Sequence, residues 1–426
     1  MRVLLIGNGG REHAIGWKLV QSPLLERLVS MPGNPGLDEL GDIVTDVNPT
    51  DPSAVVQLCE DRRIDLVIIG PEAPLAAGVA DALRAASRPV FGPDAAGAML
   101  ETSKSFANEI MAAAHVPTSQ SVTFTDRESA MLRLEEMDGP YVVKADGLAS
   151  GKGVLVTAAL DEAIDWVDAC FSGRFGSAGE TLVIEEYLEG REASIFFVCA
   201  QGEAIPLEAA RDYKRLGDGG QGPNTGGMGS YSPVSDLPED LIDWTTTRVA
   251  LPVLAELARR NIDYTGFLYV GLMLTDDGPK VLEFNVRLGD PETQVLMPRL
   301  ESDLLVLLNA AATVGLRGQT VEWNNLAAVD VVLASPGYPD RPETGLAIIG
   351  LDKVNEALVF HAGTRHAETG TITSGGRVLN VVGVAGTIEQ ARSEAYAAAN
   401  LIQFRGKQFR TDIATPFTGT EDREST

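Results

Sequence analysis

The chain has 426 residues, of which 44% are hydrophobic and 22% are charged, and its formal net charge is −26. This length predicts roughly three domains with enough apolar surface for a sizeable core. So acidic a chain is not expected to bind nucleic acid, because attraction to phosphates needs clustered Lys and Arg. No apolar run is long enough for a signal peptide or a membrane span, so we expect a cytoplasmic protein that contacts no membrane.

Three cysteines, Cys59, Cys170 and Cys199, stand far apart in the sequence. They form no CxxC pair and no ligand-like cluster with histidine, so neither a disulfide framework nor a structural zinc site is predicted. We expect each to be a small buried apolar residue.

The first hundred residues alternate between strand and helix patterns. Apolar strand patterns at 2–7, 63–70 and 89–92 are separated by helical patterns at 12–21 and 76–86. This order predicts a parallel sheet with helices on its faces.

The rest of the chain changes character twice. Between about 120 and 190 the pattern is strand, helix, two strands, helix, strand, which fits a small α+β lid. Long strands follow, two of them joined by Asp276-Asp277-Gly278, a strong hairpin signal. A helix is expected after an N-cap at Thr102 or Ser103. The predicted domains are an N-terminal α/β substrate domain (1–102), a central domain (103–120 and 192–325), a lid (121–191) and a C-terminal α+β domain (326–426).

The stretch KADGLASGKGV, residues 144–154, looks like a phosphate-binding loop. A P-loop would need glycine where Asp146 stands, and Ser or Thr where Gly153 follows Lys152. Strand patterns on both sides predict a hairpin instead. Such a loop can close over a triphosphate as a lid, or it can be a plain surface hairpin.

Two further candidate sites follow N-terminal strands. In GNGGREHA, Gly7 and Gly9 fit a dinucleotide fingerprint, but Glu12 stands where its third glycine belongs, so NAD binding is not favoured. The helix start with Arg11 suits a phosphate on a small substrate, or it is only a tight turn. Glu72 follows the third strand pattern, where it can bind substrate hydroxyls or an amine, or act as first-turn helix charge.

The segment VIEEYLEGREAS carries four acids close to an apolar strand. A strand that runs out into Glu186-Tyr187-Leu188 can present backbone groups and an apolar wall to an adenine, and Glu192 can take ribose hydroxyls. An exposed acidic turn is the alternative.

The stretch KVLEFNVRLGDPETQ is the most informative one. Alternation along a strand predicts a core face and a polar face, respectively Leu282, Phe284, Val286 and Glu283, Asn285, Arg287. The carboxylate and amide oxygens suit magnesium, and the guanidinium can stabilise charge on a transferring phosphoryl group. A solvent-facing edge strand is the alternative.

Two more features flank this strand in sequence. Asp290-Pro291 reads as the N-cap and first-turn proline of a helix. The glycine-rich run from 211 to 231 begins with Asp212 and Lys214, and its glycines allow backbone amides to approach a ligand closely.

Taken in order, GNGGREHA, GPEAPL, KADGLASGKGV, GPNTGGMGSYSP and RLGDPETQ resemble the motifs of the glycinamide ribonucleotide synthetase family, the phosphoribosylamine–glycine ligases, from residue 1 to about 415. The resemblance implies the ATP-grasp fold, mixed α/β and α+β, and makes KADGLASGKGV its lid loop. The sequence departs from the family pattern at Ser150, Tyr213 and Leu288, where Ala, His and Phe are usual, which leaves fine substrate geometry open.

The resemblance also implies roles for individual residues. ATP contacts are implied for Lys104, Lys144, Gly151, Lys152, Gly153, Glu185, Glu186, Tyr187, Leu188 and Glu192. Mg²⁺ or Mn²⁺ would be held by Glu283 and Asn285. Catalytic roles are implied for Asp212, Lys214, Arg287 and Asp290. Substrate contacts are implied for Gly9, Gly10, Arg11, Glu72, Asn224, Thr225, Gly226, Gly227, Met228 and Pro291.

The implied reaction joins glycine to 5-phosphoribosylamine at the expense of ATP, through a glycyl phosphate, and the expected assembly is a monomer. Two alternatives stay open. Another ATP-grasp carboxylate–amine ligase would share the lid and the strand with the implied metal ligands Glu283 and Asn285, but not GPNTGGMG. A non-catalytic nucleotide-binding protein would keep the lid but could lose the acid, amide and arginine of that strand, all of which are present.

Overall fold

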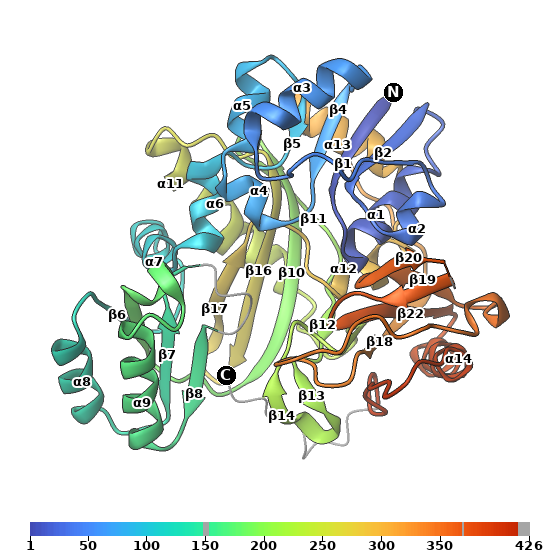
Figure 1. The fold of residues 1–426 in the computed structure, drawn as a ribbon. Coiled ribbons are helices and arrows are strands. Elements are labelled where there is room, and N and C mark those ends of the chain that lie inside the picture. Colours follow the sequence, from blue (N-terminus) through green and yellow to red (C-terminus); the bar gives the residue numbers. More distant parts are fainter. Residues whose placement is uncertain (148–152, 369, 416–426) are drawn as a thin grey trace.

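The computed structural model describes residues 1–147, 153–368 and 370–415 (Figure 1). Ser150, Gly151 and Lys152 lie outside these ranges. In Figure 1 the lid elements lie at the lower left and the C-terminal strands at the lower right, with β10, β16 and β17 between them and the N-terminal elements above.

The N-terminal residues form the predicted parallel sheet, with strand order β3-β2-β1-β4-β5. The helical pattern at 76–86 is interrupted, because Gly78 adopts a left-handed φ of 78° between α4 and α5. The elements are β1 (Arg2–Gly7), α1 (Gly10–Leu19), β2 (Arg27–Pro32), α2 (Pro35–Asp38), β3 (Asp42–Ile43), α3 (Pro52–Arg62), β4 (Leu66–Ile69), α4 (Glu72–Ala76), α5 (Val79–Ala85), β5 (Val90–Phe91) and α6 (Ala95–Thr102).

The lid follows the predicted order of strand, helix, two strands, helix and strand. Its antiparallel sheet has the order β6-β9-β7-β8, and β7 pairs with β8 as the predicted hairpin. The lid helices share a small apolar core with this sheet. The elements are β6 (Ser121–Phe124), α8 (Arg127–Glu135), β7 (Tyr141–Ala145), β8 (Val154–Thr157), α9 (Leu160–Phe171), η1 (Gly176–Gly179) and β9 (Leu182–Glu185).

A second antiparallel sheet, in the order β11-β10-β16-β17, forms the centre of the molecule. Both faces of β10 are buried, which explains its continuous apolar sequence: Ile195 and Phe197 pack in the core shared with the N-terminal helices, and Phe196 and Val198 pack in the core that contains α13. The elements are α7 (Lys104–Ala113), β10 (Arg191–Ala200), β11 (Glu203–Pro206), α10 (Leu241–Thr245), η3 (Thr246–Ala250), α11 (Leu251–Arg259), β16 (Gly266–Thr275), β17 (Gly278–Asn285), α12 (Glu292–Leu296) and α13 (Leu304–Thr313). Ser103 caps α7, as one of the two predicted candidates.

The predicted alternation along β17 is wrong at one position. The register shifts between Leu272↔Val281 and Gly271↔Glu283, so Leu282 is an extra residue in a bulge. Val281 therefore takes the core position expected for Leu282, next to Phe284 and Val286. Because a bulge re-aims the side chains that follow it, the polar face of this strand begins at Glu283.

The fourth large sheet crosses the predicted boundary at 326. Its order is β12-β15-β18-β22-β19, so two short strands of the glycine-rich run pair into the C-terminal sheet. The domain limits given above remain a prediction. The remaining elements are β12 (Arg211–Asp212), β13 (Arg215–Gly217), η2 (Asp218–Gly220), β14 (Gln221–Asn224), β15 (Gly229–Ser232), β18 (Ala327–Ala334), η4 (Leu351–Lys353), β19 (Leu358–His361), β20 (Thr364–Ala367), β21 (Gly370–Thr373), β22 (Arg377–Ala385) and α14 (Ile388–Leu401).

All three cysteines are free and buried, as expected. Among the residues that the structure describes, no helix combines the length and the apolar character that crossing a bilayer requires.

Candidate active site

Glu283 lies at the centre of a cluster of positive charges. Burial alone would raise its pKa, but the charges of four cations lower the pKa to about 2. These cations come from four places in the chain: Lys104 on α7, Lys144 on β7, Lys214 between β12 and β13, and Arg287 just after β17. Asn285 lies beside the carboxylate, with its Nδ2 3.5 Å from Glu283 Oε1. The fold thus brings three lysines from distant parts of the sequence to an ionised acid, an amide and an arginine that are close to one another in sequence.

Arg287 is held between two acids from the N-terminal region. Its NH2 lies 2.8 Å from Glu101 Oε1 and its Nε lies 3.5 Å from Glu72 Oε2. The same Glu101 side chain accepts a hydrogen bond from Val286 N, at 2.9 Å. It therefore fixes both the backbone and the Arg287 guanidinium directly after β17. Sequence reasoning missed Glu101, because an acid near a helix end reads as surface charge.

Several of the predicted ATP residues lie at or near the end of β9. Lys144 Nζ lies 2.8 Å from the buried Glu185 carboxylate, which also accepts from Ser119 Oγ. Beyond the strand, Glu186 is exposed, Tyr187 is half-buried and Leu188 is buried. The backbone therefore runs out of the sheet here as predicted, with one apolar side chain packed beneath it. Gly153 is buried, and its carbonyl accepts from Ala145 N.

Lys214 and two acids form a second charged group beside Glu283. Lys214 Nζ is bonded to Glu192, and its pKa is raised well above the usual value because neighbouring acids outweigh its burial. Burial raises the pKa of Asp212, and Glu192 adds to that effect while Lys214 opposes it. The predicted ribose contact and two predicted catalytic residues are thus one connected set.

The N-terminus of α1 already faces two carboxylates. Gly9 N donates to Glu12 Oε2 at 2.7 Å, and Arg11 N donates to Asp290 Oδ2 at 3.5 Å. Arg11 is only 7% exposed, and its guanidinium donates to Glu12 and to the carbonyl of Leu288. Because this helix start is neutralised by acids, the expected phosphate contact at Gly9–Arg11 stays a prediction.

The predicted N-cap at Asp290 is wrong. Helix α12 begins at Glu292, and its N-cap position is Pro291. The Asp290 carboxylate instead accepts from Gln294 Nε2 at 2.8 Å and faces α1. Although burial would raise its pKa, the charges of Arg377 and Arg11 hold the pKa of Asp290 below its usual value. The Asp290 side chain therefore makes long-range contacts with Arg377 and α1 instead of capping a helix, as the local sequence pattern predicts.

The predicted substrate loop, 224–228, contacts both Lys214 and the Asp290–Pro291 segment. Thr225 donates from N and Oγ1 to the carbonyl of Lys214. Gly227 packs on Pro291, where an added Cβ would lie 2.4 Å from the ring. Met228 is fully buried. Asn224 is exposed at the end of β14, and its expected substrate contact stays a prediction.

Gly10 shows how tightly the same region is packed. A Cβ at this position would lie 2.2 Å from Asn380 Nδ2 and 2.7 Å from Gln294 Nε2. A larger residue would have to displace both side-chain amides, so the glycine motif packs closely on the C-terminal strand β22.

Asp146, which stands where a P-loop would have glycine, makes a long-range contact that the sequence did not indicate. Its carboxylate accepts from Lys104 N at 2.5 Å, from Ser105 N at 3.3 Å and from Ser105 Oγ at 2.5 Å. Asp146, the first residue of the lid loop after β7, is therefore anchored on the N-terminus of α7, next to a predicted ATP lysine.

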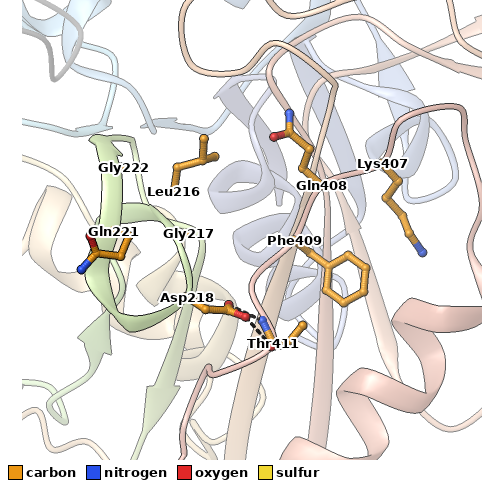
Figure 2. A pocket seen from close by; sticks show the side chains of 9 residues that line it. All are labelled: Leu216, Gly217, Asp218, Gln221, Gly222, Lys407, Gln408, Phe409 and Thr411. Carbon is orange, nitrogen blue, oxygen red and sulfur yellow. Dashed lines mark hydrogen bonds between the residues drawn. The ribbon is translucent and has the colours of Figure 1, made fainter. Parts of the chain in front are cut away.

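The cavity shown in Figure 2, about 510 Å³, lies elsewhere, between the β13–β14 hairpin and residues 407–411. None of the predicted site residues lines it. Its polar groups bond within the protein: Asp218 accepts from Thr411, and Lys407 donates to two carbonyls at the end of α14. This cavity is not a candidate for the chemistry.

The charged cluster fits a divalent metal bound with phosphates. Glu283 and Asn285 are hard oxygen ligands, and the surrounding lysines suit a polyphosphate. Within the described ranges no group of three His, Cys, Asp or Glu side chains is arranged to hold a metal ion. Magnesium needs no such group, since it is usually bound by one or two carboxylates plus substrate phosphates.

Comparison with known sequences covers nearly the whole chain. Family models for phosphoribosylglycinamide synthetase match in order: the N domain at 1–101, the ATP-grasp (A) domain at 102–293 and the C domain at 328–416. The phosphoribosylamine–glycine ligase of Rhizobium meliloti (strain 1021) is 48% identical over 414 residues, which are 97% of this chain and 98% of that protein. The protein of the same name from Brucella melitensis is 45% identical over 416 residues, with 97% of both chains covered.

Solved structures agree in fold. The crystal structure of phosphoribosylamine–glycine ligase from Thermotoga maritima superposes with a TM-score of 0.85 and 35% identity, covering 97% of this chain and 100% of that one. The biotin carboxylase domain of Hydrogenobacter thermophilus 2-oxoglutarate carboxylase, described in complex with MgADP, ADP and bicarbonate, gives a TM-score of 0.73 at 17% identity over 96% of this chain and 91% of that one, and so shares the fold. The predicted fold class is confirmed, and the chain belongs to the phosphoribosylglycinamide synthetase family of ATP-grasp ligases.

Proposed function

We propose that this chain is a phosphoribosylamine–glycine ligase of purine biosynthesis. It condenses glycine with 5-phosphoribosylamine and converts ATP to ADP and phosphate, with glycinamide ribonucleotide as product. The observation that carries this proposal is the charged cluster at Glu283. Three lysines and an arginine around one ionised carboxylate have the charge pattern that a metal-bound triphosphate needs.

The chemistry has two steps. A carboxylate is a poor acylating agent, so an oxygen of the glycine carboxylate first attacks the γ-phosphorus of ATP, and ADP leaves. The amine nitrogen of 5-phosphoribosylamine then attacks the acyl carbon of glycyl phosphate. Inorganic phosphate leaves with the bonding electrons, and the amine loses a proton as the amide forms.

The residues mainly position the reactants and stabilise charge. Lys104 and Lys144 would bind the ATP phosphates, and Arg287, already oriented by Glu101 and Glu72, would face the transferring phosphoryl group. Pre-orientation of this kind supports catalysis because the donors need not reorganise during the reaction.

The remaining residues would bind the adenosine of ATP and the second substrate. Glu186, Tyr187 and Leu188 would contact the adenine, and Glu192 the ribose. Asp290 and the 224–228 loop would bind the second substrate between the α1 side and the C-terminal side of the site.

Glu283 and Asn285 would hold Mg²⁺ or Mn²⁺. When bound, the metal neutralises phosphate charge during transfer. The low pKa of Glu283 keeps the carboxylate ready for a cation across the physiological range. A monomer in the cytoplasm is part of the proposal.

Stoichiometric ADP release tests the function directly. Purified protein should release ADP only when ATP, Mg²⁺, glycine and freshly generated 5-phosphoribosylamine are all present. Release with a different carboxylate or amine, but not with this pair, would point to another ATP-grasp ligase. ATP binding with no release under any condition would indicate a non-catalytic nucleotide-binding protein.

A further inference from the structure

Two side chains of the C-terminal region form hydrogen bonds with the tip of the 224–228 substrate loop. Gly226 N donates to Tyr338 Oη at 2.9 Å, and Arg377 NH1 donates to the Gly226 carbonyl at 2.5 Å. Both backbone polar groups of Gly226 are thus bonded by side chains that lie more than a hundred residues away.

Arg377 also contacts Asp290, which is one of the predicted catalytic residues. Arg377 NH1 donates to the backbone carbonyl of Asp290 at 2.5 Å and lies 3.4 Å from its Oδ1. One guanidinium nitrogen therefore joins the loop and the segment before α12, two chain segments that are not adjacent in sequence. The guanidinium also lies against Gly226, where a Cβ would be 3.0 Å from Arg377 Cζ, so the residue at the loop tip must be small for this contact to form.

The arginine is itself fixed. An added Cβ at the preceding residue, Gly376, would lie 2.2 Å from the Tyr338 ring, and the carbonyls of Gly375 and Gly376 accept from Ser335. The base of Arg377 is therefore set by close packing at the start of β22 and not by a flexible surface loop.

Movement at the loop tip would reach the predicted catalytic lysine. Thr225, next to Gly226, donates twice to the Lys214 carbonyl, and Gly227 N donates to Thr225 Oγ1 at 3.0 Å. Because these contacts are backbone-directed and continuous, releasing the tip would loosen the spacing between Lys214 and Asp290.

We propose that Arg377 is a positioning residue for the ligase reaction, and that it sets the spacing between Asp290 and the 224–228 loop by bonding both backbones. The inference rests on the proposed function. It makes the C-terminal region part of the active site, since the loop that faces the second substrate is completed from β22.

The primary variant is Arg377→Met, which keeps a long side chain but removes the donors and the charge. A misplacement of about 1 Å in a reactive site costs on the order of 10²-fold, so we expect kcat/KM for 5-phosphoribosylamine to fall about 10²-fold. The KM for ATP should stay within about twofold, because Arg377 contacts none of the predicted adenosine residues.

The matched control is Arg392→Met on α14. Arg392 also donates to two backbone carbonyls, those of Thr411 and Ile413, but neither belongs to the site. Both variants should lose similar thermal stability, and only Arg377→Met should lose turnover. Equal losses of kcat/KM in the two variants, or none in Arg377→Met, would overturn the proposal.

Arg377→Lys separates position from charge. Lysine restores the positive charge but is shorter by one bond and lacks the guanidinium plane. It should restore most of the charge effect and leave kcat/KM at least about tenfold below wild type. Full recovery of turnover would show that charge alone suffices, and would rule out positioning.

A readout independent of turnover keeps this test distinct from the proposed function. Asp290 faces Arg377 on β22, Arg11 on α1, Asp330 on β18 and Gln294 on α12. Removing the charge of Arg377 should raise the carboxyl pKa of Asp290, observed by NMR of the labelled side chain. If the wild-type protein shows no ligase activity but this pKa rises in Arg377→Met and not in Arg392→Met, the contact stands and the proposed function fails. An unchanged Asp290 pKa would overturn the contact itself.

Discussion

Asp146→Ala is expected to weaken ATP binding through the lid. The Asp146 carboxylate accepts from Lys104 N, Ser105 N and the Ser105 hydroxyl, so it binds free amides at the N-terminus of α7 in addition to the N-cap Ser103. Losing a side-chain acceptor at a helix N-terminus costs about 0.5–2 kcal/mol. If these contacts hold the glycine-rich loop beside Lys104, up to about 2 kcal/mol of that stabilisation is lost from ATP binding, which corresponds to about a 30-fold rise in Kd.

Calorimetric titration with a non-hydrolysable ATP analogue and Mg²⁺ measures this Kd. Asp126→Ala is the matched control, since Asp126 caps α8 in the same lid by accepting from Ser129 N at 2.8 Å. It should lose comparable stability with no change in Kd. Asp146→Asn keeps one acceptor oxygen and should give an intermediate value. Equal affinity in Asp146→Ala and wild type, or an equal loss in Asp126→Ala, would refute the reasoning.

Three further outcomes are expected. Glu283→Ala and Asn285→Ala should raise the Mg²⁺ needed for half-maximal turnover by about tenfold or more without loss of fold by circular dichroism; wild-type turnover at limiting Mg²⁺ would contradict the metal assignment. Arg287→Lys should lower kcat about 10²–10³-fold with little change in ATP-analogue affinity, because lysine cannot bridge the two acids and face a phosphoryl group at once; near-normal turnover would make Arg287 structural. Burial, and next Asp212, raise the pKa of Glu292, so the folded state keeps a proton that the unfolded state releases, and the free energy of unfolding should fall as the pH rises above about 5. Urea titrations of Glu292→Gln, with exposed Glu389→Gln as control, should show that loss removed; an unchanged pH slope would contradict it.

Local patterns were sufficient for much of the fold. Alternation and turn residues correctly gave the parallel N-terminal sheet, the lid order and the β16–β17 hairpin, because each depends on neighbours in sequence. The bulge at Leu282 was missed, since nothing in an apolar-polar alternation marks an extra residue. The pairing of β12 and β15 with the C-terminal sheet was also missed, because strands this short and rich in glycine resemble loop.

In the candidate site, too, residues with a local sequence signal could be predicted and residues with distant partners could not. Alternation and chemistry predict Glu283 and Asn285 as metal ligands, and the structure adds how the cations are arranged around Glu283. Glu101 and Arg377 gave no local signal, because each acts on a segment at least 87 residues away. Residues whose partners are distant in sequence become visible only once the chain is folded.

The transfer of oxygen from glycine to phosphate tests the account most directly. Glycine labelled with ¹⁸O in its carboxylate is supplied with ATP, Mg²⁺ and 5-phosphoribosylamine, and the inorganic phosphate is analysed by mass spectrometry. A glycyl phosphate intermediate predicts that each turnover places one ¹⁸O atom in the released phosphate. Phosphate released without label, while ADP and the amide still form, would contradict the proposed mechanism.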